Sequence, residues 1–353
     1  MSVLVVASTA TSVPMGAQEY QEQITTRAAS ALNAPSDRGD LWSVERLIFR
    51  SMRSSLNGNR RVPLGWLNTA TARQRRVVGS LVYPRHALLH RMELGLPPGR
   101  DEILTMHDTV AWRYDDEADP PAHAAEELRA AAAVICVSQY TADDVSHRFG
   151  LTRVHVAHLG IEPRFWSAEP LSARERADAG IPRRFILHAG GATARKNLEG
   201  LASAWAALSQ KHSDTSLVLA GPDHPRRTSL FGGMDRARMV GRVSQELLPR
   251  LMASAEAVIV PSHDEGFGLP VLEAMAAGVP VIVARTSSLV EVAGPAGILV
   301  GTSPGELAEG IDAVLEPGFR REQTVASGRE WARGFTWERS AAAHAEVWRA
   351  VGS

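Results

Sequence analysis

The sequence predicts an α/β protein with two domains, each built on a parallel β-sheet covered by helices. Short apolar segments alternate with helix-like segments along both halves of the chain. Strands separated by helices are typical of parallel sheets with helices on both faces. The length of 353 residues exceeds that of an ordinary single domain and suits two.

Strand and helix signals begin at the amino terminus. The apolar run Val3–Ala7 is followed by a turn at Pro14 and Gly16, and a helical pattern then extends from about Ala17 to Leu32. Ser138 precedes a segment with acidic residues in its first turn, so we expect it to cap a helix. Further strands are expected at Ile103–Met106, Val134–Val137 and Val154–Ala157.

The second half repeats the alternation more clearly. Helices are expected from about Asn197 to Lys211 and from about Pro270 to Ala277, where Gly278 ends the second one. Strands are expected at Phe185–His188, Leu217–Ala220, Ala257–Val260 and Pro280–Ala284. The last residues form an amphipathic helical pattern that offers Trp337, Val347 and Trp348 for packing.

Composition restricts the kind of protein. A hydrophobic content of 44%, a charged content of 22% and a net charge of −1 are typical of a soluble globular chain and give no general attraction to nucleic acid. The one cysteine, Cys136, lies in an apolar run and is expected to be buried. The amino terminus has no basic region and no segment is long enough to span a bilayer, so we expect a cytoplasmic location.

The segment Pro261–Val283 carries the strongest functional signal. A strand leads into a loop at the carboxyl edge of a sheet, where open α/β sheets bind ligands. Gly266 and Gly268 let the backbone approach a ligand closely, and Pro270 suits the first turn of a helix. The amino end of that helix can face an anion such as a diphosphate.

Two glutamates stand in this segment, eight positions apart. The Glu265 carboxylate, at the start of the loop, can accept hydrogen bonds from sugar hydroxyls. The Glu273 carboxylate, within the helix, can accept them from the vicinal hydroxyls of a ribose. The alternative is that the glycines only make a turn and that both glutamates lie on the surface.

A second segment, His188–Leu208, places Arg195 and Lys196 next to a helix start. Cations are unfavourable there unless an anion is bound. Only Lys196 and Lys211 among the 38 basic residues are lysines, which favours a specific role for Lys196. The alternative is a pair of solvated cations.

These strings resemble the signatures of the large retaining family of glycosyltransferases known as family four, or glycosyl transferases group 1. The resemblance rests on EGFGLP with its two glutamates and on two glycines followed by RKN. It implies a GT-B fold, in which two Rossmann-like domains face a central cleft. The domains would be residues 1–165 and 166–335, with a helix at 336–353 crossing back to the first.

The resemblance also implies roles for individual residues. Glu265 would contact the 3- and 4-hydroxyls of the donor sugar, Glu273 the ribose, and Arg195 and Lys196 the diphosphate as it leaves. Further donor contacts are implied at Gly16, Gly190, Gly191, Gly241, Val243, Gly266, Phe267, Gly268 and Leu269.

The chain departs from the family pattern at several positions. Ala192 stands where some relatives have an arginine, and Gly16 stands alone where relatives have two glycines. Met252 replaces a tyrosine, and Leu159 replaces an asparagine. The amino-terminal half, which selects the acceptor, shows the weakest match.

His107 and Asp108 follow an expected strand and resemble the family's T-x-H-D element. The resemblance implies that His107 lies close to the reacting anomeric carbon and that Asp108 lies on the acceptor side. The alternative is a structural histidine at the end of a strand.

The predicted function is transfer of a hexosyl group from a nucleotide diphosphate sugar, resembling GDP-mannose or a UDP-sugar, to a glycan, lipid-linked or small-molecule acceptor. The resemblance implies retention of configuration. We expect no bound metal or other cofactor, because the sequence lacks an Asp-x-Asp motif in a metal-dependent context. The alternative is a non-catalytic subunit that binds sugar nucleotides on the same fold. A nicotinamide-dependent dehydrogenase is disfavoured, since no G-x-G-x-x-G follows the first strand.

Residues 42–100 contain eleven arginines but only two acidic residues, Glu45 and Glu93. We expect a solvated or partner-facing basic surface that includes the cluster Arg73, Arg75 and Arg76. The alternative is a face that meets anionic lipid at the inner side of the membrane or a lipid-diphosphate acceptor.

Overall fold

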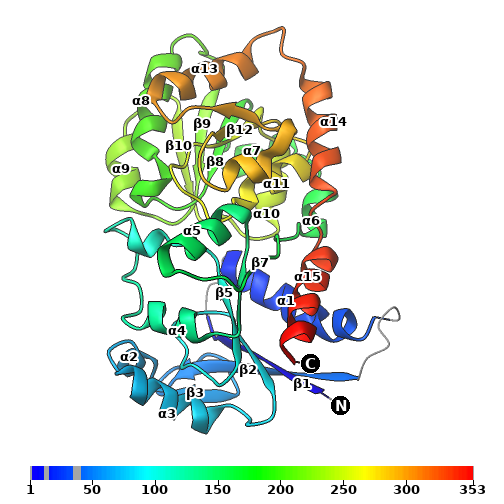
Figure 1. Cartoon of the computed structure of the whole chain (residues 1–353). Coiled ribbons are helices and arrows are strands. Elements are labelled where there is room, and N and C mark those ends of the chain that lie inside the picture. The colour runs from blue at the N-terminus through cyan, green and yellow to red at the C-terminus, as the bar shows by residue number, and fades with distance from the viewer. Residues whose placement is uncertain (1, 12–15, 35–40, 353) are drawn as a thin grey trace. The chain divides into compact units, whose positions relative to one another are not determined.

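The computed structural model describes residues 2–11, 16–34 and 41–352 (Figure 1). It divides into two compact units. Unit 1 comprises Met1–Gly160 and Thr336–Ser353, and unit 2 comprises Ile161–Phe335. Each unit contains one sheet in which every strand pair is parallel, so the predicted α/β class with two Rossmann-like domains is confirmed.

The sheet of unit 1 has seven strands in the order β3-β2-β1-β4-β5-β6-β7. The strands are β1 Ser2–Thr9, β2 Trp42–Ser51, β3 Arg60–Val62, β4 Leu88–Arg91, β5 Glu102–Met106, β6 Ala133–Cys136 and β7 Val154–Val156. The helices are α1 Gly16–Leu32, α2 Leu64–Leu67, α3 Ala72–Val82, η1 Val110–Trp112, α4 Ala124–Ala130, α5 Gln139–Phe149 and α15 Trp337–Gly352. The chain changes direction across the sheet between β1 and β4, which is its topological switch point.

The sheet of unit 2 has six strands in the order β10-β9-β8-β11-β12-β13. The strands are β8 Phe185–Ala189, β9 Ser216–Ala220, β10 Ala237–Gly241, β11 Ala257–Val260, β12 Val281–Ala284 and β13 Ile298–Val300. The helices are α6 Pro163–Trp166, α7 Ala173–Asp178, η2 Ala194–Lys196, α8 Leu198–Leu208, α9 Pro225–Phe231, α10 Leu247–Ala253, α11 Leu269–Ala276, α12 Leu289–Ala293, η3 Gly294–Ala296, α13 Pro304–Leu315 and α14 Arg321–Ala332. The switch point of this sheet lies between β8 and β11.

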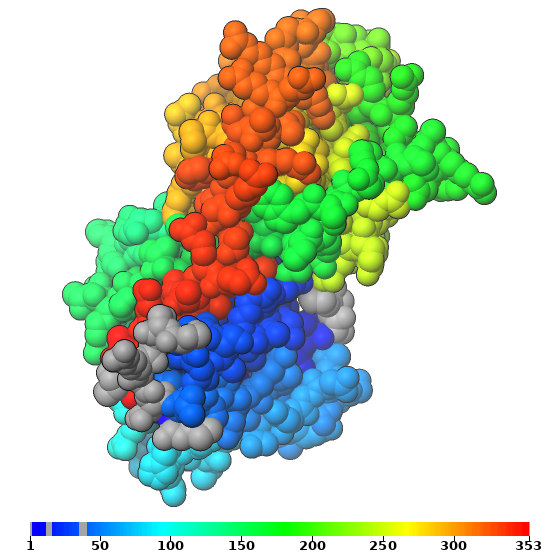
Figure 2. Space-filling view, turned by 90° about the vertical axis from the view of Figure 1, so that its right-hand side faces the viewer, coloured from blue at the N-terminus to red at the C-terminus, as the bar shows by residue number. Residues whose placement is uncertain are grey.

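The last helix belongs to unit 1, although it follows unit 2 in the chain. Helix α15 packs along α1, and Figure 2 shows the surfaces of these two helices side by side. Arg349 of α15 donates hydrogen bonds to the carbonyl oxygens of Ala31 and Leu32, at 2.6 and 3.0 Å. Trp337 and Trp348 are buried, as the amphipathic pattern predicts.

Several local predictions are confirmed at the level of single residues. The Ser138 hydroxyl accepts a hydrogen bond from the Thr141 amide at 3.0 Å and so caps α5. Cys136 is buried on β6, and burial raises the pKa of its thiol. Helix α8 ends at Leu208, three residues before the predicted end, and Asn197 caps its start.

One expectation about the basic segment is wrong. Arg75 is buried, and its guanidinium donates to the Glu127 carboxylate at 2.6 Å, which compensates its charge there. Arg91 is also buried and pairs with Glu102 at 2.7 Å and with Glu127 at 2.8 Å. Both guanidinium groups also donate to the Leu96 carbonyl oxygen. These two arginines therefore hold the interior of unit 1 together and do not belong to an exposed face.

None of the described helices combines the length and the apolar character needed to cross a bilayer.

Candidate active site

The carboxyl ends of β8 and β11 bring two loops together at the switch point of unit 2. The His263 amide donates to the Arg195 carbonyl oxygen at 2.7 Å, which joins the loop after β11 to the loop after β8. The Asn197 side chain donates to the carbonyl oxygens of Pro261 at 3.0 Å and Thr302 at 2.9 Å. Ligands bind at such switch points in open α/β sheets, so the geometry supports a site here.

The buried carboxylate of Glu265 and the half-buried cations of Arg195 and Lys196 form one ionic cluster at this point. The Glu265 carboxylate accepts from Arg195 at 2.8 Å and from Lys196 at 2.5 Å, and the Ser262 hydroxyl donates to it at 2.8 Å. Burial alone would raise the pKa of Glu265, but the charges of Lys196 and Arg195 outweigh it and hold the pKa at about 2. The cluster therefore contains an ionised carboxylate and two cations, with a net charge of +1.

Two serines of the loop after β12 fix the backbone around Glu265. The Glu265 amide donates to the Ser287 hydroxyl at 3.0 Å. The Ser288 hydroxyl lies 2.7 Å from the Glu265 carbonyl oxygen and 2.9 Å from that of Phe267. Sequence reasoning missed these serines, because nothing in their local pattern distinguishes them from ordinary loop residues.

Helix α11 begins directly after the loop that follows β11, as the Gly and Pro signals predict. Gly268 caps the helix with φ of 99°, and a Cβ atom there would lie 2.6 Å from the Leu289 side chain. The amides of Phe267, Gly268 and Leu269 therefore lie at the amino end of α11, where the helix dipole favours an anion. Glu273 lies farther along α11 and is half-buried.

The glycines after β8 rest on two buried side chains that sequence reasoning missed. The Arg227 guanidinium donates to the carbonyl oxygens of Gly190 at 2.7 Å and Gly191 at 3.2 Å. His188 Nδ1 lies 3.2 Å from the Ile259 carbonyl oxygen, and burial lowers the pKa of His188 to about 4. A Cβ atom on Gly190 would lie 3.4 Å from His188 Nε2, while one on Gly191 would meet nothing within 4 Å.

The remaining predicted donor contacts in unit 2 lie on the other side of β8. Gly241 ends β10 with φ of 68°, and its carbonyl oxygen accepts from the Gly221 amide at 2.8 Å. Val243 follows in the next loop and is half-buried. Since β9 separates β10 from β8, these residues share the carboxyl edge with the ionic cluster but do not contact it directly.

His107, Asp108 and Gly16 belong to unit 1. The His107 ring meets the Tyr20 ring edge-on, with centroids 4.9 Å apart, and burial lowers the pKa of His107 to about 4. Asp108 accepts a hydrogen bond from the Val110 amide at 3.2 Å. Gly16 is the exposed first residue of α1, whereas Pro14 and Met15 of the predicted glycine loop lie outside the described residues.

Within the described ranges, no group of three or more His, Cys, Asp or Glu side chains could hold a metal ion. The expectation that the reaction needs no metal stays a prediction.

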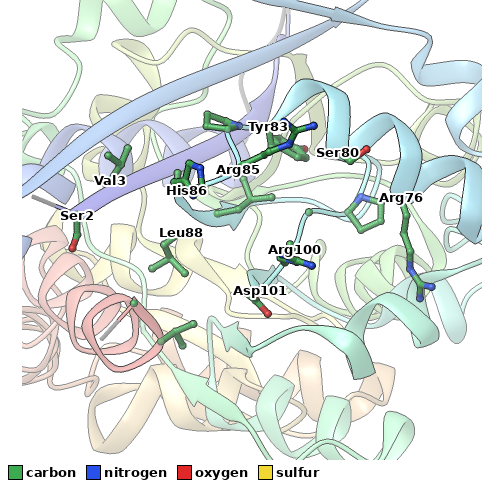
Figure 3. A pocket seen from close by; sticks show the side chains of 18 of the residues that line it. Ser2, Val3, Arg76, Ser80, Tyr83, Arg85, His86, Leu88, Arg100 and Asp101 are labelled. Carbon is green, nitrogen blue, oxygen red and sulfur yellow. The ribbon is translucent and has the colours of Figure 1, made fainter.

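Unit 1 also contains a hollow of about 930 Å³ at the edge of its sheet where β1 and β4 begin (Figure 3). Ser2, Val3 and Leu88 line it from the amino ends of β1 and β4. Arg76, Arg85, His86 and Arg100 also line it. His107 follows the carboxyl end of β5, so this basic hollow is not the predicted acceptor site.

Unit 2 contains a region that matches the model of a known protein family. Residues 172–331 match the family model of glycosyl transferases group 1. The matched region contains Arg195, Lys196, Glu265 and Glu273.

Two curated relatives are mannosyltransferases. The chain is 35% identical over 162 residues to O-antigen chain mannosyltransferase B of Escherichia coli, covering 44% of this chain and 42% of the relative. It is 29% identical over 223 residues to a GDP-mannose-dependent alpha-(1-6)-phosphatidylinositol dimannoside mannosyltransferase of Mycobacterium tuberculosis, covering 59% of this chain and 55% of the relative. The chain thus spans about half the length of these relatives.

Solved structures identify the fold. Sucrose-phosphate synthase from Thermosynechococcus elongatus superposes with a TM-score of 0.76 over 99% of both chains, at 21% identity. The fold is therefore GT-B, as predicted.

Proposed function

We propose that this protein is a retaining glycosyltransferase that moves a hexosyl group from a nucleotide diphosphate sugar to an acceptor without a bound metal. The observation that carries the proposal is the cluster of Glu265, Arg195 and Lys196 at the switch point of unit 2, beside the amino end of α11. The cluster provides positive charge for a diphosphate and an ionised carboxylate for sugar hydroxyls in one place.

The cations are the part of the cluster that suits a leaving nucleotide. As the bond to the anomeric carbon breaks, negative charge grows on the diphosphate, and preorganised cations stabilise that charge. Glu265 holds both cations in place before the donor arrives, since each of its oxygens accepts from one of them. The amides at the start of α11 would bind the remaining phosphate oxygens.

Glu265 is poorly suited to act as a nucleophile. Its oxygens already accept hydrogen bonds from Arg195, Lys196 and Ser262, which lower the nucleophilicity of the carboxylate. We therefore favour a mechanism in which the acceptor approaches the same face that the nucleotide leaves. The leaving phosphate would then help to deprotonate the acceptor.

The donor we propose first resembles GDP-mannose, because the two curated relatives are mannosyltransferases and one is described as GDP-mannose-dependent. A UDP-sugar is the alternative. The acceptor is a glycan, a lipid-linked sugar or a small molecule, and its identity stays open.

The decisive experiment is incubation with a panel of nucleotide sugars without acceptor, in the presence and absence of EDTA. We expect slow release of GDP or UDP that EDTA does not change and that Glu265→Ala abolishes. Glu256→Ala is the matched control, because Glu256 pairs with Arg184 at the amino end of β11, away from the cluster. Tight nucleotide binding without turnover under any acceptor would instead favour a non-catalytic binding subunit.

We further propose that unit 1 contacts anionic membranes through α2, α3 and their neighbouring loops. Trp66, Val77 and Leu81 are 44%, 52% and 78% exposed there. The same part of the chain carries exposed arginines, namely Arg53, Arg60, Arg61, Arg73, Arg76, Arg85 and Arg100. Apolar side chains within a basic surface are typical of interfacial binding.

Binding to vesicles with and without phosphatidylserine tests this contact. Arg73→Glu combined with Arg76→Glu should reduce binding to the acidic vesicles, and added salt should weaken it. Arg75 is unsuitable for this test, because its loss would disrupt the buried ion pair with Glu127. Equal binding to neutral and acidic vesicles would rule out the electrostatic contact.

A further inference from the structure

A chain of hydrogen bonds runs through the interior of unit 1 and connects four elements. Its side chains are Tyr20 of α1, His90 of β4, Thr105 of β5, and His344 and Trp348 of α15. Each of these residues is at most 2% exposed. Buried polar side chains that are fully paired favour one arrangement of the elements that carry them.

The chain has five links. Trp348 Nε1 lies 3.1 Å from His90 Nδ1, and His90 Nε2 lies 2.8 Å from Thr105 Oγ1. Thr105 Oγ1 lies 2.9 Å from Tyr20 Oη, which lies 2.6 Å from His344 Nε2. His344 Nδ1 lies 2.7 Å from the Ser340 carbonyl oxygen. Both ends lie on α15, so the chain forms a closed path from that helix through the sheet and α1 and back.

The direction of every hydrogen bond follows from the two ends. The Ser340 carbonyl oxygen only accepts, so His344 donates from Nδ1, and its Nε2 must accept from the Tyr20 hydroxyl. Tyr20 then accepts from the Thr105 hydroxyl, which in turn accepts from His90 Nε2. His90 Nδ1 is left to accept from the Trp348 indole, a group that only donates. No link is left with two donors or two acceptors.

Neutral histidines are required for this pattern, and burial supplies them. Burial lowers the pKa of His344 to about 4, and burial together with the neighbouring His344 and His107 lowers that of His90 well below its usual value. The pattern therefore exists as drawn at neutral pH.

The chain of hydrogen bonds passes next to His107. The Tyr20 ring stands edge-on to the His107 ring, with an interplanar angle of 89°. Thr105 lies two residues before His107 on the same strand end. His107 Nε2 is buried without a hydrogen-bond partner among the described residues, so no bond from that atom orients the ring. Packing against Tyr20 is therefore a main constraint on the imidazole.

We infer that Tyr20 and His344 are positioning residues that hold the His107 imidazole in its working orientation. The inference rests on the proposed transferase function, in which His107 lies near the reacting sugar. It gives the last helix a specific task, since His344 reaches Tyr20 across 324 positions of sequence.

Kinetic measurements on variants of the full chain test this inference. Tyr20→Phe keeps the ring but removes the hydroxyl, and His344→Leu removes its acceptor. We expect each to lower the rate of nucleotide release from the donor sugar by about tenfold, since small displacements of a catalytic group are costly. The Kd for GDP or UDP should stay within about twofold of the wild-type value, because that site lies in unit 2. The double variant should lose little more than either single variant, since both break the same link.

Two further variants separate positioning from loss of stability. His344→Gln retains an acceptor for Tyr20 and should restore most of the rate lost in His344→Leu. Val347→Ala removes buried methyl groups from the same helix outside the chain of hydrogen bonds and should keep the wild-type rate at a comparable loss in Tm. A wild-type rate in His344→Leu, or an equal loss of rate in Val347→Ala, would overturn the inference.

Histidine ¹⁵N NMR distinguishes failure of this inference from failure of the proposed function. In the wild-type spectrum His344 should be protonated at Nδ1 and His90 at Nε2, with the signals assigned by single His→Gln variants. Tyr20→Phe should shift the His107 ring signals and leave those of His188 in unit 2 unchanged. If no donor is turned over, the transferase proposal fails, whereas unchanged His107 signals in Tyr20→Phe defeat the positioning role alone.

Discussion

The Glu265 carboxylate is restricted by its surroundings to one protonation state. Lys196 and Arg195 hold its pKa at about 2 even though burial acts in the opposite direction. An ionised carboxylate accepts hydrogen bonds but has no proton to give. Glu265 can therefore bind sugar hydroxyls and hold the two cations, but it cannot act as a general acid near neutral pH.

The substitution Glu265→Gln separates the two tasks of this residue. It removes the negative charge from a buried cluster whose cations remain, so the net charge rises from +1 to +2. We expect affinity for GDP or UDP to rise by about tenfold, equivalent to about 1.4 kcal/mol, as measured by calorimetry. Turnover should fall by about 10²-fold or more, because sugar contacts and the arrangement of the cations are lost.

Stability measurements complete this test. The unliganded Glu265→Gln variant should have a lower Tm than the wild type, since two half-buried cations lose their counter-charge. Nucleotide should raise the Tm of the variant more than that of the wild type. Glu256→Gln, which affects an ion pair at the other edge of the sheet, should lower the Tm without changing nucleotide affinity. Weaker nucleotide binding in Glu265→Gln would contradict the assignment of the cations to the diphosphate.

Glu273 and His107 should affect different steps. We expect Glu273→Ala to weaken nucleotide binding, because the resemblance assigns this carboxylate to the ribose. His107→Ala should leave nucleotide binding within about twofold and reduce turnover, since His107 lies in unit 1 and is assigned to the reacting carbon. Calorimetry and donor turnover on both variants provide the comparison, and an equal loss of binding in the two would refute this division.

At the scale of elements, the start of α11 depends on one glycine. Gly268 has a φ of 99°, and a Cβ atom would approach Leu289 to 2.6 Å. Gly268→Ala should therefore destabilise unit 2 by about 1–3 kcal/mol through the strained backbone, in addition to the cost of moving Leu289. Because the amides of the α11 start would shift, nucleotide affinity should fall as well. Urea unfolding and calorimetry measure the two effects.

Gly305 offers the matched control. It lies in the first turn of α13, and a Cβ atom there would meet nothing within 4 Å. Gly305→Ala should stabilise the protein by about 0.5–1 kcal/mol, since alanine loses less conformational entropy on folding. Nucleotide affinity should stay unchanged. A Gly268→Ala variant that behaves like Gly305→Ala would mean that the conformation at Gly268 is not required.

Apolar runs bounded by turn residues allowed most strands to be predicted from sequence. The run Ala257–Val260 is strand β11 with the same bounds, and the predicted helix after it is α11, shifted by one residue. Strands β2, β3, β4, β10 and β13 were not predicted. Strand β2 mixes charged with apolar residues, and β10 is a half-exposed edge strand, so neither forms an uninterrupted apolar run.

The site shows the same limit. Glu265, Arg195 and Lys196 are recognised from their motifs, and the structure brings them into contact. His188 of β8 and Arg227 of α9 support the glycine loop. Neither has a local signal in the sequence, because its role depends on which strands are neighbours. Arg75 shows the converse error, since a cluster of arginines in sequence does not reveal which guanidinium points inward.

At the scale of the whole molecule, four histidines make stability depend on pH. Burial lowers the pKa of His107, His188 and His344 to about 4, and that of His90 well below its usual value. In the unfolded chain each would bind a proton near pH 6.5. The unfolded state therefore binds more protons than the folded state below about pH 6.5, so stability falls as the pH drops from there towards 4.

The two units should respond differently to acid, because three of these histidines lie in unit 1 and only His188 lies in unit 2. Each buried histidine contributes a slope of about 1.4 kcal/mol per pH unit in this window. Carboxylates such as Glu265, whose folded pKa is about 2, lose their stabilising effect only below about pH 4.5 and do not interfere. We therefore expect unit 1 to open before unit 2 between pH 6.5 and 4.5.

Hydrogen exchange with mass spectrometry, corrected for intrinsic exchange, can follow each unit separately across this pH range. His344→Gln should reduce the pH dependence of unit 1 by about 1.4 kcal/mol per pH unit and leave that of unit 2 unchanged. His86→Gln, which changes an exposed histidine of the same unit, should alter neither. Because His344 is also the link between α15 and Tyr20, the peptides of α1 and α15 should be the first in unit 1 to lose protection in acid. Simultaneous opening of both units at one pH would show that the histidines of unit 1 do not control its acid stability.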